Sequence, residues 1–284
     1  MKPIRLLSRL TLLAILFLES FVLSGCAGPV APVKPVSPTP TRRIDLSGDL
    51  YLRQIGEGAF VITHSYPWPA NSLLVEMPNG TLVMAGTPYT PEATRSVLDW
   101  AKKQFGNRKV VAIDTGYHVD NLGGNQALIE AGIPVYGSDL TVQMLQERGE
   151  KTRQQMLSLI GDTSSLYYAA YQKMVFTPPD HVFPVKQGLV LSFGGQTVQV
   201  IYPGPSQAPD KLAVYFPARK LLFGSCMILG GTSVGNTADA DLKNWPEAVK
   251  SLQKYRADVI VPGHGDRLDP GLIQHTLDLL AAAP

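Results

Sequence analysis

Three side chains of types that bind zinc follow runs of strand character in this sequence. Asp120, Cys226 and His264 each come shortly after such a run. Because α/β domains present loop side chains at the ends of their strands, the shared location of these three residues past strand ends makes them candidates for one site. An oxygen, a sulfur and a nitrogen ligand suit zinc, and three protein ligands with an open fourth position form the pattern of catalytic zinc. Such an ion lowers the pKa of a water molecule toward roughly 7 and polarises a carbonyl oxygen.

The same residues have other interpretations. Taken singly, His264 fits a surface loop, Cys226 a buried structural thiol and Asp120 a solvated carboxylate. A second chemistry makes Cys226 a nucleophile, with His264 or His118 as its partner base. A chelator distinguishes the two enzymatic interpretations, because it abolishes activity only where zinc is required.

The elements that must position these residues alternate between strand and helix patterns. Thr90 before Pro91 predicts a helix start, and this helix should end near residue 105. His118 and Asp120, two positions apart, project from the polar loop after a predicted strand. Strands are expected at 51–55, 59–63, 72–77, 81–85, 109–113, 189–193, 197–202, 212–216, 220–223 and 258–261, the first four as a meander with a Pro78-Asn79-Gly80 turn. Further helices are expected at 121–131, 139–173 with a break at 161–163, 243–256 and 270–282. Two sets of strands with helices between them predict one layered α/β domain with two sheets.

The composition excludes several classes of protein. With 284 residues, 45% of them hydrophobic, the chain can bury the core of one large domain. Two cysteines cannot build a disulfide scaffold. A formal net charge of +2 gives no electrostatic footprint for nucleic acid. We therefore expect no nucleic-acid partner. We also expect a monomer that acts on a small molecule.

The amino terminus has the pattern of an export signal. A basic start containing Lys2 is followed by an almost continuous apolar run over residues 10–23, too short for a comfortable transmembrane helix. The run ends in Leu23-Ser24-Gly25-Cys26, which resembles the bacterial lipoprotein cleavage box. This predicts a signal peptide over residues 1–25 and lipidation of Cys26. The alternatives are an uncleaved membrane anchor and an ordinary secretory signal.

Residues 26–44 are rich in proline and small residues, which favours an extended tether between a membrane and the domain at 45–284. Ala27 resembles the residue found after the lipidated cysteine in lipoproteins sorted to the outer membrane. We therefore expect a lipid-anchored protein of the bacterial cell envelope, at the outer membrane facing the periplasm.

Five stretches of the chain occur in the order found in one enzyme family. They are Asp114-Thr115-Gly116-Tyr117-His118-Val119-Asp120-Asn121-Leu122-Gly123-Gly124-Asn125, Gly204-Pro205-Ser206-Gln207-Ala208-Pro209-Asp210, Tyr215-Phe216-Pro217 with Leu222-Phe223-Gly224-Ser225-Cys226, Gly235-Asn236-Thr237-Ala238-Asp239, and Gly263-His264-Gly265-Asp266. The first resembles the His-x-His-x-Asp loop of the metallo-β-lactamase superfamily, in the form found in its β-lactamases. The resemblance covers the chain from residue 51 onward and implies an αββα sandwich of four layers, with the metal in a groove at the sheet edges.

Four positions depart from the pattern of that family. Gly116 and Gln207 stand where the family has two of the three histidines of one zinc site, so only His118 remains of it. Gly86 stands where many members have an aspartate that supports the loop. Leu229 stands where a lysine usually binds the substrate carboxylate, which weakens the assignment of a β-lactam substrate.

The other zinc site of the family, formed here by Asp120, Cys226 and His264, is complete. One complete and one incomplete site resemble the mono-zinc subclass of the β-lactamases, and this resemblance implies one zinc ion.

The implied activity is a zinc-dependent hydrolase, with a β-lactam amide as the leading substrate. His118 is the candidate general base; its alternative is a loop histidine bonded to the backbone. Asn236 resembles a residue that hydrogen-bonds the substrate near the developing oxyanion, and its alternative is turn formation. Gln207 could donate a hydrogen bond in the same groove. Other interpretations are a hydrolase of another ester, a thioester or a lactone, and a non-catalytic envelope protein that binds a ligand in a degenerate site.

Overall fold

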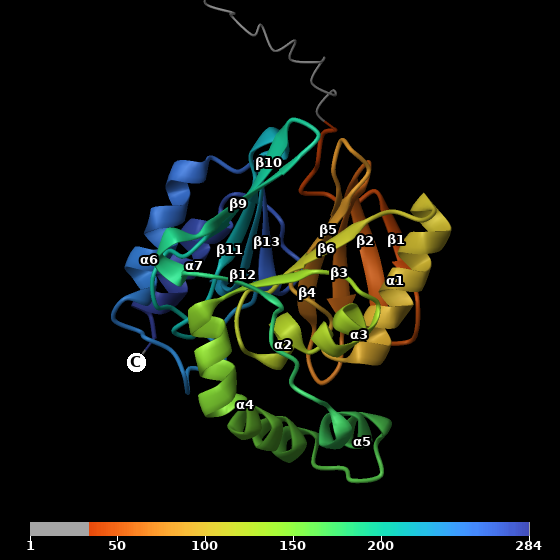
Figure 1. The fold of residues 1–284 in the computed structure, drawn as a ribbon. Helices are drawn as coiled ribbons and strands as arrows, with labels where there is room; N and C mark the ends of the chain where they lie inside the picture. Colours follow the sequence, from red (N-terminus) through yellow and green to blue (C-terminus); the bar gives the residue numbers. More distant parts are fainter. Residues whose placement is uncertain (1–33, 284) are drawn as a thin grey trace, which may run out of the picture. The chain divides into compact units, whose positions relative to one another are not determined.

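Two β-sheets lie against each other, and helices cover their outer faces (Figure 1). The computed structural model describes residues 34–283. The first sheet contains, in spatial order, β1 (Arg42–Asp45), β2 (Leu50–Gly56), β3 (Ala59–His64), β4 (Ala70–Glu76), β5 (Leu82–Ala85), β6 (Val110–Ile113), β7 (Val135–Ser138) and β8 (His181–Phe183). The second contains, in spatial order, β13 (Val259–His264), β12 (Leu221–Leu229), β11 (Ala213–Phe216), β10 (Gln196–Ile201) and β9 (Leu189–Phe193).

The first sheet begins with the predicted antiparallel meander. Strands β2 to β5 pair in sequence order, and each is antiparallel to the one before it. The turn between β4 and β5 forms at Pro78-Asn79-Gly80, where Gly80 has a φ of 80° and Met77 N donates to Thr81 O at 2.8 Å. From β5 onward the pairing is parallel through β6, β7 and β8. Parallel pairing brings the loop after β6, which contains His118, to one edge of the sheet.

Seven α-helices connect the strands or cover the sheets within the described residues. They are α1 (Pro91–Phe105), α2 (Val119–Leu122), α3 (Asn125–Glu130), α4 (Asp139–Ile160), α5 (Leu166–Lys173), α6 (Trp245–Ser251) and α7 (Leu272–Ala281). Helix α1 begins as predicted, because Thr90 Oγ1 accepts a hydrogen bond from Ala93 N at 3.2 Å and Pro91 is the first helical residue. The predicted break in the long helical segment also occurs, between Ile160 and Leu166.

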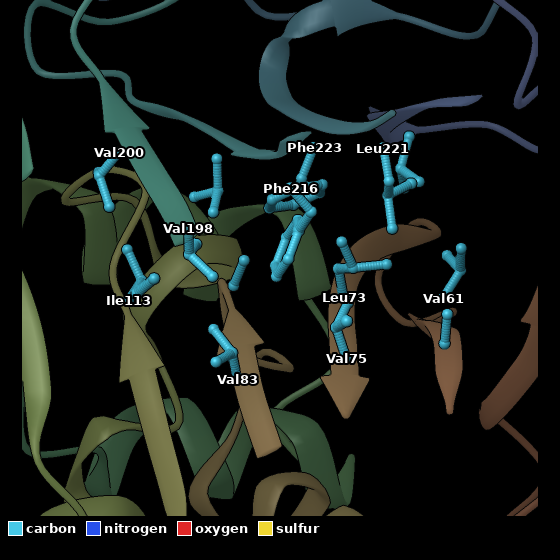
Figure 2. Packing of buried hydrophobic residues seen from close by; sticks show 14 of the residues in the cluster. Val61, Leu73, Val75, Val83, Ile113, Val198, Val200, Phe216, Leu221 and Phe223 are labelled. Atoms are coloured by element: carbon cyan, nitrogen blue, oxygen red, sulfur yellow. The ribbon is translucent and has the colours of Figure 1, made fainter. Parts of the chain in front are cut away.

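The main core lies between the two sheets. Figure 2 shows aliphatic side chains of the first sheet facing aliphatic and aromatic side chains of the second. The labelled residues are Val61, Leu73, Val75, Val83 and Ile113 from the first sheet and Val198, Val200, Phe216, Leu221 and Phe223 from the second. Helix α1 buries Val97 in a separate cluster on the outside of the first sheet, and α6 and α7 bury Trp245 and Leu272 outside the second. The order helix, sheet, sheet, helix is the expected αββα sandwich.

Two expectations about the site segments need correction. The helix expected at 121–131 is two short helices, α2 and α3, which are separated by a turn at Gly123-Gly124. The strand expected to end at residue 223 continues as β12 to Leu229, so Cys226 lies within a strand and not after it.

Three short strands, β1, β7 and β8, were not expected from the sequence. Each has only three or four residues.

The segment expected to be a free tether lies partly on the domain. Lys34 Nζ donates to Glu76 Oε2 at 3.0 Å, Val36 forms an antiparallel bridge with Gly56, and β1 pairs with β2. The folded part therefore begins before Asp45. The predicted signal peptide, Cys26 and the tether as far as residue 33 lie outside the described residues. Among the described helices, none combines the length and the apolar character needed to cross a membrane.

Candidate metal centre

Asp120, Cys226 and His264 converge at the wall of one cavity. One ligand atom from each lies within 4.8 Å of the others. The Cys226 sulfur is 3.1 Å from Asp120 Oδ2, and His264 Nε2 is 3.2 Å from the same oxygen. The structure thus brings together the three residues that were predicted to be metal ligands.

Cys226 and His264 are neighbours because β12 and β13 are parallel and adjacent. The register of this pair shifts between Phe223 and Ser225, and Ser225 has a φ of 50°. A register shift of this kind changes the direction of the side chains that follow it in the strand, here that of Cys226. A Cβ on Gly263 would lie 2.6 Å from Cys226 N, so the close approach of the two strands requires glycine there.

A buried amide supports the Asp120 carboxylate. Asn121 Nδ2 donates to Asp120 Oδ1 and lies 3.6 Å from the Cys226 sulfur. The Asn121 side-chain oxygen accepts from Thr115 Oγ1 at 2.7 Å and from Ser225 Oγ at 2.6 Å. The orientation of the amide is therefore fixed, and with it that of Asp120. The sequence pattern indicated no role for Asn121, although this residue follows the proposed ligand Asp120 directly.

His264 is oriented by the backbone. Its Nδ1 lies 2.8 Å from Pro69 O, so this nitrogen carries the proton and donates to the carbonyl. The other ring nitrogen, Nε2, faces Asp120 and the sulfur of Cys226. This arrangement is common for a histidine that binds a metal, because a second-shell acceptor selects its tautomer.

The charges at the centre are mutually stabilising. Burial raises the pKa of Asp120, but the hydrogen bond with His264 and the positive charges of Lys211 and His264 outweigh it, so this pKa falls well below its usual range. Burial lowers the pKa of His264, but its hydrogen bonds to Asp120 and Cys226 outweigh that effect and raise it. A carboxylate, a sulfur and an imidazole nitrogen that share one small space are a set that zinc fits.

His118 lies next to this centre and is held by Asp239. Its Nε2 is 3.3 Å from Asp239 Oδ2, and the same oxygen accepts from Tyr117 OH at 2.7 Å. Arg148 Nη1 and Lys151 Nζ lie 3.2 and 3.6 Å from the other carboxylate oxygen. The hydrogen bond with His118 is the largest of the contacts that lower the pKa of Asp239 well below its usual range. The sequence pattern indicated no role for Asp239, although this residue ends the family-like stretch Gly235-Asn236-Thr237-Ala238-Asp239.

Gln207 and Asn236 border the same cavity. Gln207 Nε2 donates to Asn236 O at 3.4 Å, and its buried Oε1 has no hydrogen-bond partner among the described residues. Asn236 Oδ1 accepts from Ala238 N at 3.0 Å, which is the turn-forming contact considered as its alternative role.

The ligands open into a cavity of about 470 Å³. None of its lining residues is a lysine or an arginine. They are Trp68, Tyr89, His118, Val119, Asp120, Thr152, Gln155, Met156, Leu159, Gln207, Cys226, Leu229, Gly230, Gly231, Ser233, Val234, Gly235, Asn236 and His264. A pocket of this size suits a small molecule.

Comparison with known proteins identifies the family. The model of the metallo-beta-lactamase superfamily matches residues 65–264. The chain is 28% identical over 216 residues to a metallo-beta-lactamase type 2 of Bacillus cereus, over 75% of this chain and 73% of the relative. It is 26% identical over 259 residues to a metallo-beta-lactamase type 2 of Bacteroides fragilis, over 87% of this chain and 91% of the relative.

Comparison of the fold with solved structures indicates the same family. A solved metallo-beta-lactamase from Pontibacter korlensis superposes with a TM-score of 0.69 at 30% identity, over 82% of this chain and all of that one. Members of this superfamily are generally hydrolases and normally bind zinc. The family match, the two-sheet fold and the converging Asp, Cys and His ligands lead to one conclusion: this chain belongs to the metallo-beta-lactamase superfamily.

Proposed function

We propose that this protein is a hydrolase that uses one zinc ion, held by Asp120, Cys226 and His264. The observation that carries the proposal is the convergence of these three ligand atoms within 4.8 Å at the end of a cavity. A zinc ion in such a site supplies Lewis-acid polarisation of a carbonyl and a lowered pKa for a water molecule.

His118 is the residue placed to move a proton. Asp239 accepts a hydrogen bond from Nε2–H of His118 and so selects the tautomer in which Nδ1 is unprotonated. His118 lines the cavity, so Nδ1 can accept a proton from an attacking water and return it to the leaving group. Gln207 and Asn236 stand at the wall of the cavity, where their amide groups can donate to a substrate oxygen.

The leading substrate class is the β-lactam amide. The relatives from Bacillus cereus and Bacteroides fragilis are named metallo-beta-lactamases type 2, and they align with most of this chain. A strained cyclic amide needs attack at one carbonyl and protonation of one nitrogen, which His118 can serve in turn.

A second candidate class is an uncharged ester, thioester or lactone. It is supported by the cavity itself, because no lysine or arginine lines it and the apolar Leu229 is part of its wall. A substrate carboxylate buried in this cavity would find no lysine or arginine to pair with, which costs free energy.

The test uses the purified full chain with zinc, and a panel of a carbapenem, a cephalosporin, a penicillin, a thioester and a lactone. We expect one equivalent of zinc, loss of zinc in Cys226→Ser, and loss of all turnover after chelation. Two tightly held equivalents would contradict the one-metal proposal. Turnover that survives chelation would favour Cys226 as a nucleophile, and metal content near zero would favour a non-catalytic binding protein.

We further propose that the chain is a lipoprotein anchored through Cys26 in the bacterial envelope, on the basis of the Leu23-Ser24-Gly25-Cys26 motif. Labelling with radioactive palmitate should mark the native chain and not Cys26→Ser. Equal labelling of both would contradict the anchor.

A further inference from the structure

The Asp239 carboxylate lies among groups from two separate parts of the chain. One of its oxygens accepts from Tyr117 OH at 2.7 Å and lies 3.3 Å from His118 Nε2, both in the loop after β6. The other oxygen lies 3.2 Å from Arg148 Nη1 and 3.6 Å from Lys151 Nζ, both on α4. The Asp239 side chain is only 7% exposed, and a buried carboxylate costs free energy unless cations compensate it. The proton transfer proposed for His118 does not by itself account for the two cations of α4.

Arg148 makes the stronger of the two cationic contacts. Its side chain is 36% exposed, against 58% for Lys151, and its nitrogen is closer to the carboxylate. Arg148 Nη1 donates a hydrogen bond to Asp239 Oδ1, whereas the contact of Lys151 is an ion pair alone. A charge-assisted hydrogen bond is stronger than a neutral one, and solvent weakens an exposed ion pair. Arg148 is therefore the cation that holds this carboxylate.

The helix that carries Arg148 also forms part of the cavity wall. Its lining residues follow Arg148 at positions i+4, i+7, i+8 and i+11; they are Thr152, Gln155, Met156 and Leu159. This spacing places them on the same face of the helix as Arg148. The contact between Arg148 and Asp239 thus connects the face of α4 that borders the cavity to the carboxylate that orients His118.

We propose that Arg148 is a positioning residue, which holds the Asp239 carboxylate against His118 and fixes α4 at the wall of the cavity. One contact then sets both the orientation of the ring that moves a proton and the position of a wall that touches the substrate. Arg148 is not among the described residues that line the cavity, so it acts through Asp239 and α4. The kinetic part of the proposal rests on the proposed function.

The first experiment compares the histidine rings of the zinc-loaded native full chain, Arg148→Met and Arg148→Lys. Nitrogen-15 NMR reports which ring nitrogen carries the proton, and the signal of His118 is assigned by its loss in His118→Gln. A lysine can replace Arg148 because a single guanidinium nitrogen contacts Asp239. We expect the Nε2-protonated form in the native chain and in Arg148→Lys, and a mixture of both tautomers in Arg148→Met. Arg148→Gln takes the place of Arg148→Met should the latter fail to fold.

The second experiment measures kcat and KM with the member of the substrate panel that is hydrolysed fastest. Arg148→Met should lower kcat and raise KM, each by about 3–10-fold, because it releases both the carboxylate beside His118 and the wall of the cavity. Arg148→Lys should recover most of both losses. Tyr117→Phe removes a donor to Asp239 but leaves α4 in place, so it should lower kcat and keep the native KM. Zinc content should be native in all three variants.

The matched control is Arg95→Met, which removes an arginine that pairs with Glu130 at 2.8 Å; neither residue lines the cavity. It should keep the native tautomer, kcat and KM. A native tautomer of His118 in Arg148→Met, or losses that Arg148→Lys does not reverse, would overturn the role of Arg148 and leave the hydrolase proposal standing. A changed tautomer in a chain that hydrolyses no member of the panel would overturn the hydrolase and support the positioning of His118 by Arg148.

Discussion

At the scale of single residues, the groups placed to bind the metal differ from the groups that orient them. Asp120, Cys226 and His264 present their donor atoms to one point, while Asn121 and the carbonyl of Pro69 fix two of them from behind. Asp239 plays the same supporting part for His118. Removal of a residue that only orients a ligand or His118 should therefore change the rate of hydrolysis or the affinity for zinc, while all three metal ligands remain.

Asp239→Asn should lower kcat by about 10–100-fold with zinc content unchanged, because the amide no longer fixes the tautomer of His118. Steady-state kinetics and metal analysis on the same preparation check this. Glu247→Gln, an exposed acid on α6, is the control and should retain native rates. A native kcat in Asp239→Asn would contradict the role of His118 in proton transfer.

His64 should make the free energy of unfolding depend on pH. Its ring accepts a hydrogen bond from Tyr89 N at 3.2 Å, and burial lowers the pKa of His64 despite the nearby Asp49. Because the folded pKa lies below the unfolded value of about 6.5, the unfolded state binds the proton first as pH falls. Stability should be complete above about pH 6.5 and decrease below it, by at most about 1.4 kcal/mol per pH unit.

Urea unfolding at several pH values between 5 and 7.5 measures this dependence. His64→Asn keeps an acceptor for Tyr89 N but cannot be protonated, so its unfolding free energy should change less over this range. An identical slope in both proteins would assign the dependence to other groups.

At the scale of elements, the parallel pair β12 and β13 builds the centre. Cys226 lies within β12 beyond a register shift, and His264 is the last residue of β13. The two strands approach so closely at Gly263 that a methyl group there would meet backbone atoms of Cys226. The positions of Cys226 and His264 relative to each other therefore depend on glycine at position 263.

Gly263→Ala should lower stability by about 1–3 kcal/mol and weaken zinc binding, because the added methyl group forces the strands apart. Thermal unfolding and a zinc titration test this. Gly48→Ala is the matched control, since a Cβ there meets no atom within 4 Å. Native zinc affinity in Gly263→Ala would show that the ligands tolerate separation of the strands.

At the scale of the whole molecule, the metal centre depends on the core between the sheets. Asp120 is 106 positions away from Cys226 in the sequence, and only the packing of one sheet on the other brings α2 next to β12 and β13. Leu73 and Phe223 are among the buried residues that fill this interface (Figure 2).

Leu73→Ala should lower the free energy of unfolding by about 2–5 kcal/mol, because it leaves a cavity between the sheets. Zinc release and loss of circular dichroism should then occur in one transition at a lower urea concentration. Val190→Ala, at a residue 62% exposed, should change stability little. Zinc release well before the loss of secondary structure would show that the centre is independent of this core.

The sequence by itself determined the meander, helix α1 with its Thr90 cap, the two-sheet class and the three candidate ligands, because each depends on local pattern or residue type. The sequence did not show that β12 continues past Cys226 or that α2 and α3 are separate helices, because local residue patterns define the ends of elements poorly. Only the tertiary structure placed Asp239 on His118 and Arg148 beside Asp239. Charges and hydrogen bonds depend on distance in space, and the chain fixes that distance only once both sheets have packed.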